Sequence, residues 1–132
     1  SSLQSLEVLR QRRAGRMVHP VHGSLTQLPF SDDSFDAVLC ANVLQNVEGT
    51  DRRQRCVREL ARVCRPGGRV VVTVHHHSRP RRRAGWRKEG PSGGHSGPIG
   101  YIYRFLPDEF RDLLASELAV RRLTGCGFPL PY

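Results

Sequence analysis

Apolar and polar positions along this chain follow two different periods, which predict a strand, a helix and a second strand in turn. Residues 35–41 (FDAVLCA) form an almost unbroken apolar run, which is typical of a strand covered on both faces. Residues 50–64 carry one apolar stripe at helical spacing. Pro66 ends that helix, and residues 69–74 (RVVVTV) predict the second covered strand. This order of elements indicates a parallel α/β sheet.

Weaker patterns flank this strand–helix–strand unit. Apolar residues at helical spacing predict a helix over residues 3–14, and the alternation in 17–23 (MVHPVHG) predicts an edge strand. Residues 78–100 are rich in Gly, Pro and Arg, a composition that predicts a mobile insertion. A further helix is expected to begin at Pro107, and residues 119–123 (AVRRL) predict a weak final strand.

The predicted sheet indicates where a ligand would bind. In parallel α/β sheets, ligands lie in the crevice beyond the carboxyl ends of the strands. Three segments follow the predicted strands and are therefore candidates for that crevice, namely 23–25, 41–43 and 75–77.

Composition narrows the class of protein. At 132 residues the chain has one domain's worth of sequence, enough to bury a core. No stretch approaches the roughly 18 apolar residues of a membrane span, and the start shows no signal-peptide pattern. The four cysteines are scattered and form no C-x-x-C pair, so we expect no metal site and no disulfide framework, and a reducing cytoplasm is the expected compartment.

The net charge of +9 is concentrated in the insertion. Residues 78–100 hold six basic residues against Glu89, a net charge of +5, so the rest of the chain carries only +4. Such a basic segment could contact the phosphates of a nucleic acid, or it could form a solvated loop over the predicted crevice.

The order of the motifs resembles a known family. HGSLTQLPFSDDSFDAVLCANVLQNV (22–47) is followed by a helix and then by RELARVCRPGGRVVVTV (58–74). This series resembles the class I S-adenosylmethionine-dependent methyltransferases, in particular the type 11 methyltransferases that include ubiquinone and menaquinone biosynthesis enzymes. YRFLPDEFRDLL (103–114) is similar to a late helix of that family. In that family the stretch after the 69–74 strand often shapes the acceptor pocket, so the resemblance also allows residues 78–100 to be a lid over the substrate.

The resemblance implies a Rossmann-like α/β fold, a three-layer sandwich, in partial form. The first two strands and the last strand of the family have no counterpart here, nor does the family's glycine-rich loop. The chain also opens with Ser1 rather than Met. We therefore expect residues 1–132 to be a partial methyltransferase domain of a longer enzyme and to be inactive alone.

The same resemblance implies S-adenosylmethionine as the cofactor. Residues after the glycine of the first motif would contact the adenine ring, and residues just past the 35–41 strand would line the methionine arm. The family often has Asp where this chain has Ser24, and a serine is a weaker acceptor. The alternative that these are ordinary loop residues stays open. The implied cofactor-binding residues are Gly23, Ser24, Leu25, Ala41, Asn42 and Val43.

Three histidines stand where the 69–74 strand meets the predicted crevice. Strand alternation places His75 and His77 on one face and His76 on the other. His75 or His77 could act as a general base near neutral pH, or both could be exposed residues at a strand end.

These observations leave three functions open. The first is methyl transfer to a small-molecule acceptor. The second is RNA methylation that uses the basic residues 79–88, and the third is a non-catalytic methyltransferase-like interaction module. The sequence predicts neither the acceptor nor the oligomeric state.

Overall fold

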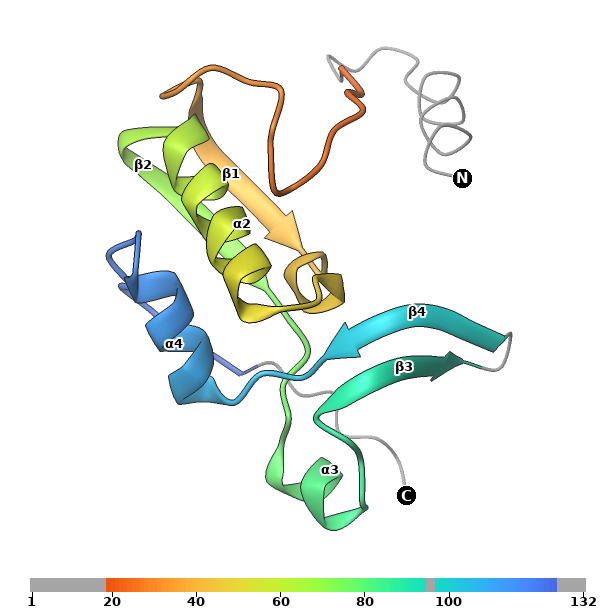
Figure 1. Ribbon diagram of the computed structural model, residues 1–132. Helices are drawn as coiled ribbons and strands as arrows, with labels where there is room; N and C mark the ends of the chain where they lie inside the picture. The colour runs from red at the N-terminus through yellow and green to blue at the C-terminus, as the bar shows by residue number, and fades with distance from the viewer. Residues whose placement is uncertain (1–18, 95–96, 126–132) are drawn as a thin grey trace.

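The computed structural model describes residues 19–94 and 97–125 (Figure 1). Most of the elements are joined by short connections along the chain. They are, in order, β1 (Phe35–Ala41), η1 (Leu44–Asn46), α2 (Thr50–Val63), β2 (Cys64–Thr73), α3 (Arg79–Arg83), β3 (Glu89–Gly94), β4 (Gly97–Tyr103) and α4 (Pro107–Ala115). The helix predicted over 3–14 and the first two residues of the predicted strand 17–23 lie outside the described residues.

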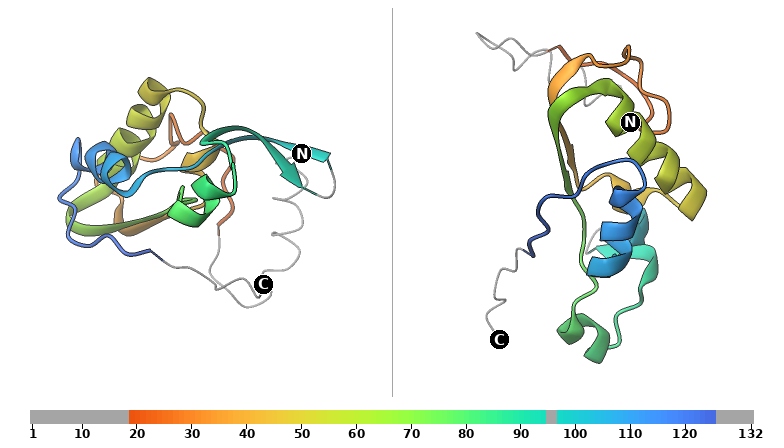
Figure 2. Two further views of the ribbon diagram at one scale, coloured as in Figure 1. Left: turned by 90° about the horizontal axis from the view of Figure 1, so that it is seen from below. Right: turned by 90° about the vertical axis from the view of Figure 1, so that its left-hand side faces the viewer.

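The predicted parallel pair of strands is confirmed. β1 and β2 run side by side in parallel, in register from Ala37 opposite Arg69 to Ala41 opposite Thr73. In Figure 2, α2 and α4 both lie to one side of these strands. On the opposite face, the described part of the chain leaves Leu39 69% exposed and Val71 53% exposed. The described residues therefore form two layers of the expected sandwich.

The hydrophobic core forms between β1, α2 and the segment from β4 to α4. The helical stripe predicted over 50–64 supplies Cys56, Val57 and Leu60, all buried. The other buried members come from β1, η1 and the segment from β4 to α4; they are Cys40, Leu44, Tyr103, Phe105, Phe110 and Leu114. Burial of this stripe against the sheet is the main stabilisation of α2, because an isolated helix of this length is marginal in water.

The Pro-Gly-Gly sequence makes the passage from helix to strand abrupt. α2 ends at Val63 and β2 begins at Cys64, five residues before the predicted start of the strand. Gly67 has φ +78°, a conformation that favours glycine. Gly68 lies so close to its neighbours that a Cβ there would be 2.6 Å from Cys64 Sγ and 2.8 Å from the Asp36 carbonyl oxygen. The two glycines are therefore needed for different reasons.

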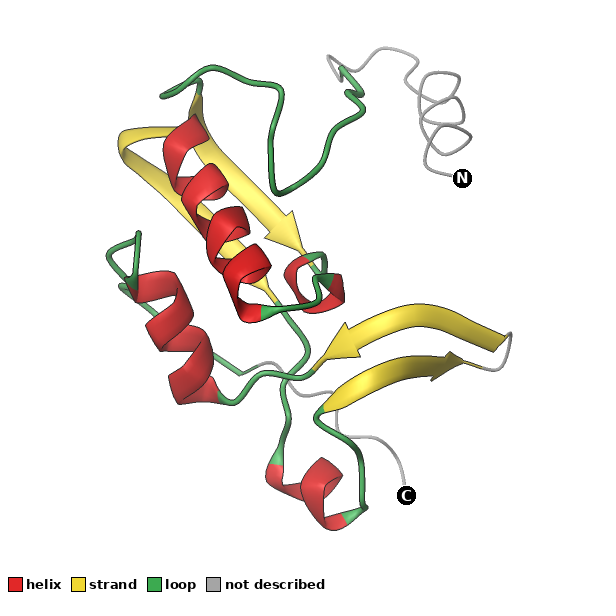
Figure 3. Ribbon diagram, in the orientation of Figure 1, coloured by secondary structure: helices red, strands yellow, loops and turns green. Residues whose placement is uncertain are grey.

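Two sequence predictions are wrong, and a third segment contains more regular structure than its composition indicated (Figure 3). Residues 19–23 form no strand, since Pro20 removes a backbone donor there. Residues 119–123 also form no strand; Val120 and Leu123 instead pack irregularly against the core. The insertion 78–100 contains α3 and most of an antiparallel hairpin, β3–β4, paired from Glu89 opposite Tyr103 to Gly94 opposite Gly97.

None of the helices in the described ranges combines the length and the apolar character that a membrane crossing requires.

Candidate functional site

The chain turns sharply where β1 reaches its carboxyl end. Asn42 has φ +57°, a left-handed conformation that Asn tolerates better than most residues. Its backbone N–H donates to the Thr73 carbonyl oxygen at 3.0 Å, and Asn46 Nδ2 donates to the Asn42 carbonyl oxygen at 3.2 Å. Ala41 and Val43 on either side are exposed. These contacts hold an open, partly apolar edge at the end of the strand.

The loop that carries Gly23, Ser24 and Leu25 packs on the same core as this edge. Leu25 lies against the core cluster that contains Cys40 and Leu44, the residues just before and after the β1 turn. Ser24 Oγ lies 2.8 Å from Thr26 Oγ1 and closes a tight local turn. A Cβ at Gly23 would lie 2.8 Å from Cδ of Pro29, so a larger residue there would require the Pro29 ring to shift. Packing on one apolar core thus connects residues 23–25 with the turn at 41–43, the first two segments predicted to face the crevice.

Two charged residues of α2 fasten this loop. Glu59 accepts a hydrogen bond from the Leu28 backbone N–H at 2.8 Å. Arg62 donates to the carbonyl oxygens of Phe30 and Leu28 at 2.8 and 3.1 Å. Arg62 also donates to Glu59, and that hydrogen bond is the main cause of the lowered pKa of the Glu59 carboxyl. The sequence analysis missed this anchor, although the i, i+3 spacing of the two residues was visible.

The predicted histidines extend β2 into the crevice. His75 N–H donates to Gln45 Oε1 at 2.7 Å, and the backbone of His75 and His77 pairs with Phe105. His75 is exposed, but His77 is only 8% exposed, so the expectation of two exposed residues is wrong for His77. Desolvation and nearby arginines lower the pKa of both imidazoles, which keeps them neutral at pH 7.

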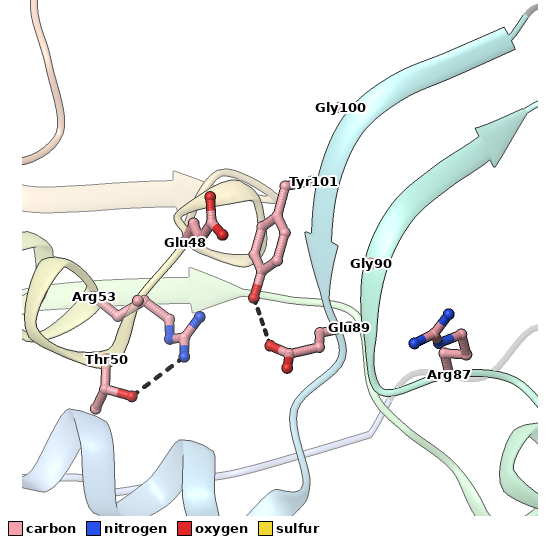
Figure 4. Close-up of a pocket in the computed structure, with 9 residues that line it drawn as sticks. Glu48, Thr50, Arg53, Arg87, Glu89, Gly90, Gly100 and Tyr101 are labelled. Carbon is pink, nitrogen blue, oxygen red and sulfur yellow. Dashed lines mark hydrogen bonds between the residues drawn. The ribbon is translucent and has the colours of Figure 1, made fainter.

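A pocket of about 760 Å³ lies beyond the carboxyl ends of β1 and β2 (Figure 4). The turn before α2 forms one wall and the β3–β4 hairpin forms the other. Its lining residues are Glu48, Gly49, Thr50, Arg53, Arg87, Glu89, Gly90, Gly100 and Tyr101. None of the six predicted cofactor residues is among them, so the structure places this pocket beside the predicted crevice segments and not on them.

The pocket presents both charged and aromatic groups. Arg53 is 6% exposed and donates to the Val47 carbonyl oxygen at 3.0 Å, and its guanidinium lies 4.0 Å from the centre of the Tyr103 ring. Tyr101 donates to Glu89 Oε2 at 2.9 Å. Burial raises the pKa of Tyr101, which keeps its hydroxyl protonated. The pocket can therefore orient a polar, planar ligand by hydrogen bonds and ring contacts.

The sequence analysis did not identify these pocket residues. One of them left a signal: Arg53 lies three and four residues before Cys56 and Val57, so it falls on the buried stripe of α2. A charged residue at such a position needs partners. Within residues 19–94 and 97–125, no group of three or more His, Cys, Asp or Glu side chains is arranged to hold a metal ion.

Comparison with known proteins bears on residues 1–72 most directly. A family model described as "Methyltransferase domain" matches these residues, which are more than half of the chain. The chain is also 54% identical over 59 residues to a protein of Mycolicibacterium paratuberculosis named demethylmenaquinone methyltransferase, covering 45% of this chain and 24% of the relative. A protein of the same name from Streptomyces avermitilis is 45% identical over 69 residues, covering 49% of this chain and 29% of the relative.

Solved structures support the fold across more of the chain. A S-adenosylmethionine-dependent methyltransferase of Methanosarcina mazei superimposes with a TM-score of 0.68 at 16% identity, covering 86% of this chain and 63% of that protein. At this identity the likeness establishes a Rossmann-like α/β fold and nothing finer. The matched part of the chain spans about a quarter of the length of the curated relatives.

Proposed function

This chain belongs to the methyltransferase-domain family, and from that premise we propose that it acts within a longer enzyme that transfers a methyl group from S-adenosylmethionine to a small molecule. The observation that carries the proposal is the open turn at the carboxyl end of β1, which lies inside the matched residues 1–72. Of the four cysteines, the three that lie in the described part of the chain, Cys40, Cys56 and Cys64, are free and buried, and we propose a reducing cytoplasm as the compartment.

The donor would lie along the edge formed by residues 23–25 and 41–43. S-adenosylmethionine, when bound, supplies an electrophilic methyl group on a sulfonium. The residues present fit such a ligand in part: Ala41 is small and exposed, Val43 offers apolar surface, and Ser24 has a hydroxyl for a polar edge of the adenine. The left-handed turn at Asn42 directs the chain away from the strand end and leaves that end open.

The acceptor would occupy the pocket between α2 and the hairpin. Methyl transfer is an in-line displacement, so holding two reactants in the right orientation supplies much of the rate. Tyr101 and Arg53 can orient a planar polar acceptor there. His75 is exposed and neutral at pH 7 and lies past the carboxyl end of β2, outside the lining of this pocket, so it can accept a proton from an acceptor that extends from the pocket to that strand end. The relatives' names make demethylmenaquinone the first acceptor to test.

The proposal predicts two separate results for the full-length enzyme. S-adenosylmethionine should bind in a calorimetric titration, and the enzyme should methylate a small-molecule acceptor faster than single-stranded RNA. The absence of donor binding would identify a non-catalytic module. Donor binding with turnover only on RNA would identify an RNA methyltransferase. Either outcome contradicts the proposal.

A further inference from the structure

Two buried nitrogen atoms beyond the end of β2 have no hydrogen-bond partner within the described residues. They are His77 Nδ1 and Arg104 Nε. Buried polar atoms in folded proteins are almost always paired, so each unpaired one needs an explanation. Both belong to the region after residue 72, where the family match ends. Their role therefore has to be worked out from this chain's own structure.

Backbone hydrogen bonds hold Arg104 close to the histidine segment. Its N–H donates to the Lys88 carbonyl oxygen at 2.8 Å, and Nη1 donates to the Arg87 carbonyl oxygen at 2.8 Å. The next residue, Phe105, accepts from the His77 backbone and donates to the His75 backbone, both at 2.9 Å. These hydrogen bonds fix Arg104 between the extension of β2 and the start of β3, while its buried Nε has no partner within the described residues.

The charges around these two atoms are predominantly positive. Arg82, Arg104 and Lys88 act on His77, and Arg81 and Arg104 act on His75. The nearest ion pair is that of Lys88 with Glu109, at 3.0 Å, and Glu109 also accepts from the Tyr103 hydroxyl. Within this group, the Glu109 carboxylate is therefore the one anion paired with a cation, while the cations number four: Arg81, Arg82, Lys88 and Arg104. Uncompensated cations in a partly buried region are unfavourable unless an anion joins them.

Trp86 contributes a flat surface to this group. The Arg104 guanidinium lies 5.2 Å from the centre of its ring, and that of Arg81 lies 5.4 Å away. Arg81 Nη1 also donates to the His76 carbonyl oxygen at 2.9 Å. The indole and the backbone thus hold two guanidiniums in place, which lowers the entropy lost when they bind a ligand.

We propose that the cluster of His77, Arg81, Lys88 and Arg104 binds a phosphate group of a small molecule. A phosphate has two negative charges and several acceptor oxygens, and arginine forks match its geometry. A single carboxylate would leave most of the cations uncompensated. RNA fits less well, because Trp86, which is 51% exposed, is the only aromatic residue of the segment 78–94, and single-stranded nucleic acids bind to several stacking rings in succession.

Trp86 provides the measurement, since it is the one tryptophan of these 132 residues and Trp86→Phe isolates its part of the fluorescence change. Its fluorescence in the full-length protein should change saturably when inorganic phosphate or pyrophosphate is added at constant ionic strength. Arg104→Gln should weaken this binding about tenfold or more, because it removes a charge-assisted hydrogen bond. The matched control is Arg79→Gln, which removes one exposed charge from the same segment and should leave the affinity within about twofold. Trp86→Phe should abolish the signal.

Several results would overturn the proposal. No saturable change with either anion would do so, as would equal weakening by Arg104→Gln and Arg79→Gln. Tight binding of single-stranded RNA without binding of phosphate or pyrophosphate would indicate a nucleic-acid surface instead. The titration involves no methyl donor, so its failure is independent of the proposed methyl transfer.

Discussion

Removing the Glu59 carboxylate should release the loop that carries Ser24 and Leu25. The Glu59 side chain is 16% exposed and accepts three hydrogen bonds at 2.8 Å, one from the Leu28 N–H and two from Arg62. Glu59→Ala leaves the Leu28 N–H and the Arg62 guanidinium without this acceptor. Hydrogen bonds to charged groups are each worth about 1.5–3 kcal/mol net. Water can replace part of this loss at a partly exposed site, so we expect about 2 kcal/mol in total.

The assay is amide hydrogen exchange followed by mass spectrometry on a peptide that covers residues 24–34 in the full-length enzyme. A local loss of about 2 kcal/mol corresponds to roughly 30-fold faster exchange in that peptide. Affinity for S-adenosylmethionine should fall with it, since Ser24 and Leu25 lose their fixed position. The matched control is Glu117→Ala, which removes the acceptor of an exposed ion pair with Arg58. That variant should change local stability by less than about 1 kcal/mol.

The effect should also depend on pH. The pKa of Glu59 is lowered in the folded protein, so its contribution to stability is present above the ordinary carboxyl pKa of 4.5 and is lost as the pH falls through the lowered value. Wild type and Glu59→Ala should therefore converge in acid. Unchanged exchange in residues 24–34 after Glu59→Ala, or an equal change with Glu117→Ala, would refute the role of this anchor.

Three further outcomes follow from the fold. In urea denaturation, Gly68→Ala should destabilise the full-length enzyme by about 2 kcal/mol or more, because the new Cβ meets backbone and sulfur atoms. Gly67→Ala should cost about 1 kcal/mol, because its Cβ meets no atom and only the positive φ is unfavourable. Equal effects of the two variants would contradict this distinction. The pKa of His77 is lowered in the folded protein, so below pH 6.5 the unfolded state binds more protons than the folded state does. The free energy of unfolding should therefore decrease as the pH is lowered from 7 to about 5.5, and it should decrease less steeply in His77→Leu. An identical pH dependence in the two proteins would exclude His77 as a cause. Burial raises the pKa of Cys56 to about 11, so brief iodoacetamide treatment of the native protein at pH 8 should leave its peptide unlabelled; rapid labelling would contradict its burial.

The β1–α2–β2 unit could be predicted because its signals are local. An apolar run, a helical stripe and a Pro-Gly-Gly break each depend on neighbouring residues, and the family resemblance depends on the same motifs. The start of the second strand was predicted a few residues too late, since β2 begins at Cys64, before Pro66. The crowding around Gly68 that fixes this boundary involves Asp36, which is distant in sequence.

The hairpin and the pocket could not be predicted in the same way. β3 is rich in glycine, and its pairing with β4 is a contact between strands that no local periodicity reveals. The pocket combines Arg53 of α2 with Glu89 and Tyr101 of the hairpin, which follow it in the sequence by 36 and 48 positions. Burial of His77 likewise depends on its pairing with Phe105. The six cofactor residues, in contrast, rest on the family resemblance and remain a prediction.

The carboxyl end of β1 is the central part of the proposed S-adenosylmethionine site. Its most direct test is calorimetric titration of the full-length enzyme with S-adenosylmethionine after Ala41→Leu, with Ala115→Leu, an exposed alanine at the end of α4, as the matched control. We expect Ala41→Leu to weaken donor binding about tenfold or more with an unchanged melting temperature, and Ala115→Leu to bind as wild type does. Equal donor affinity in both variants would contradict the account.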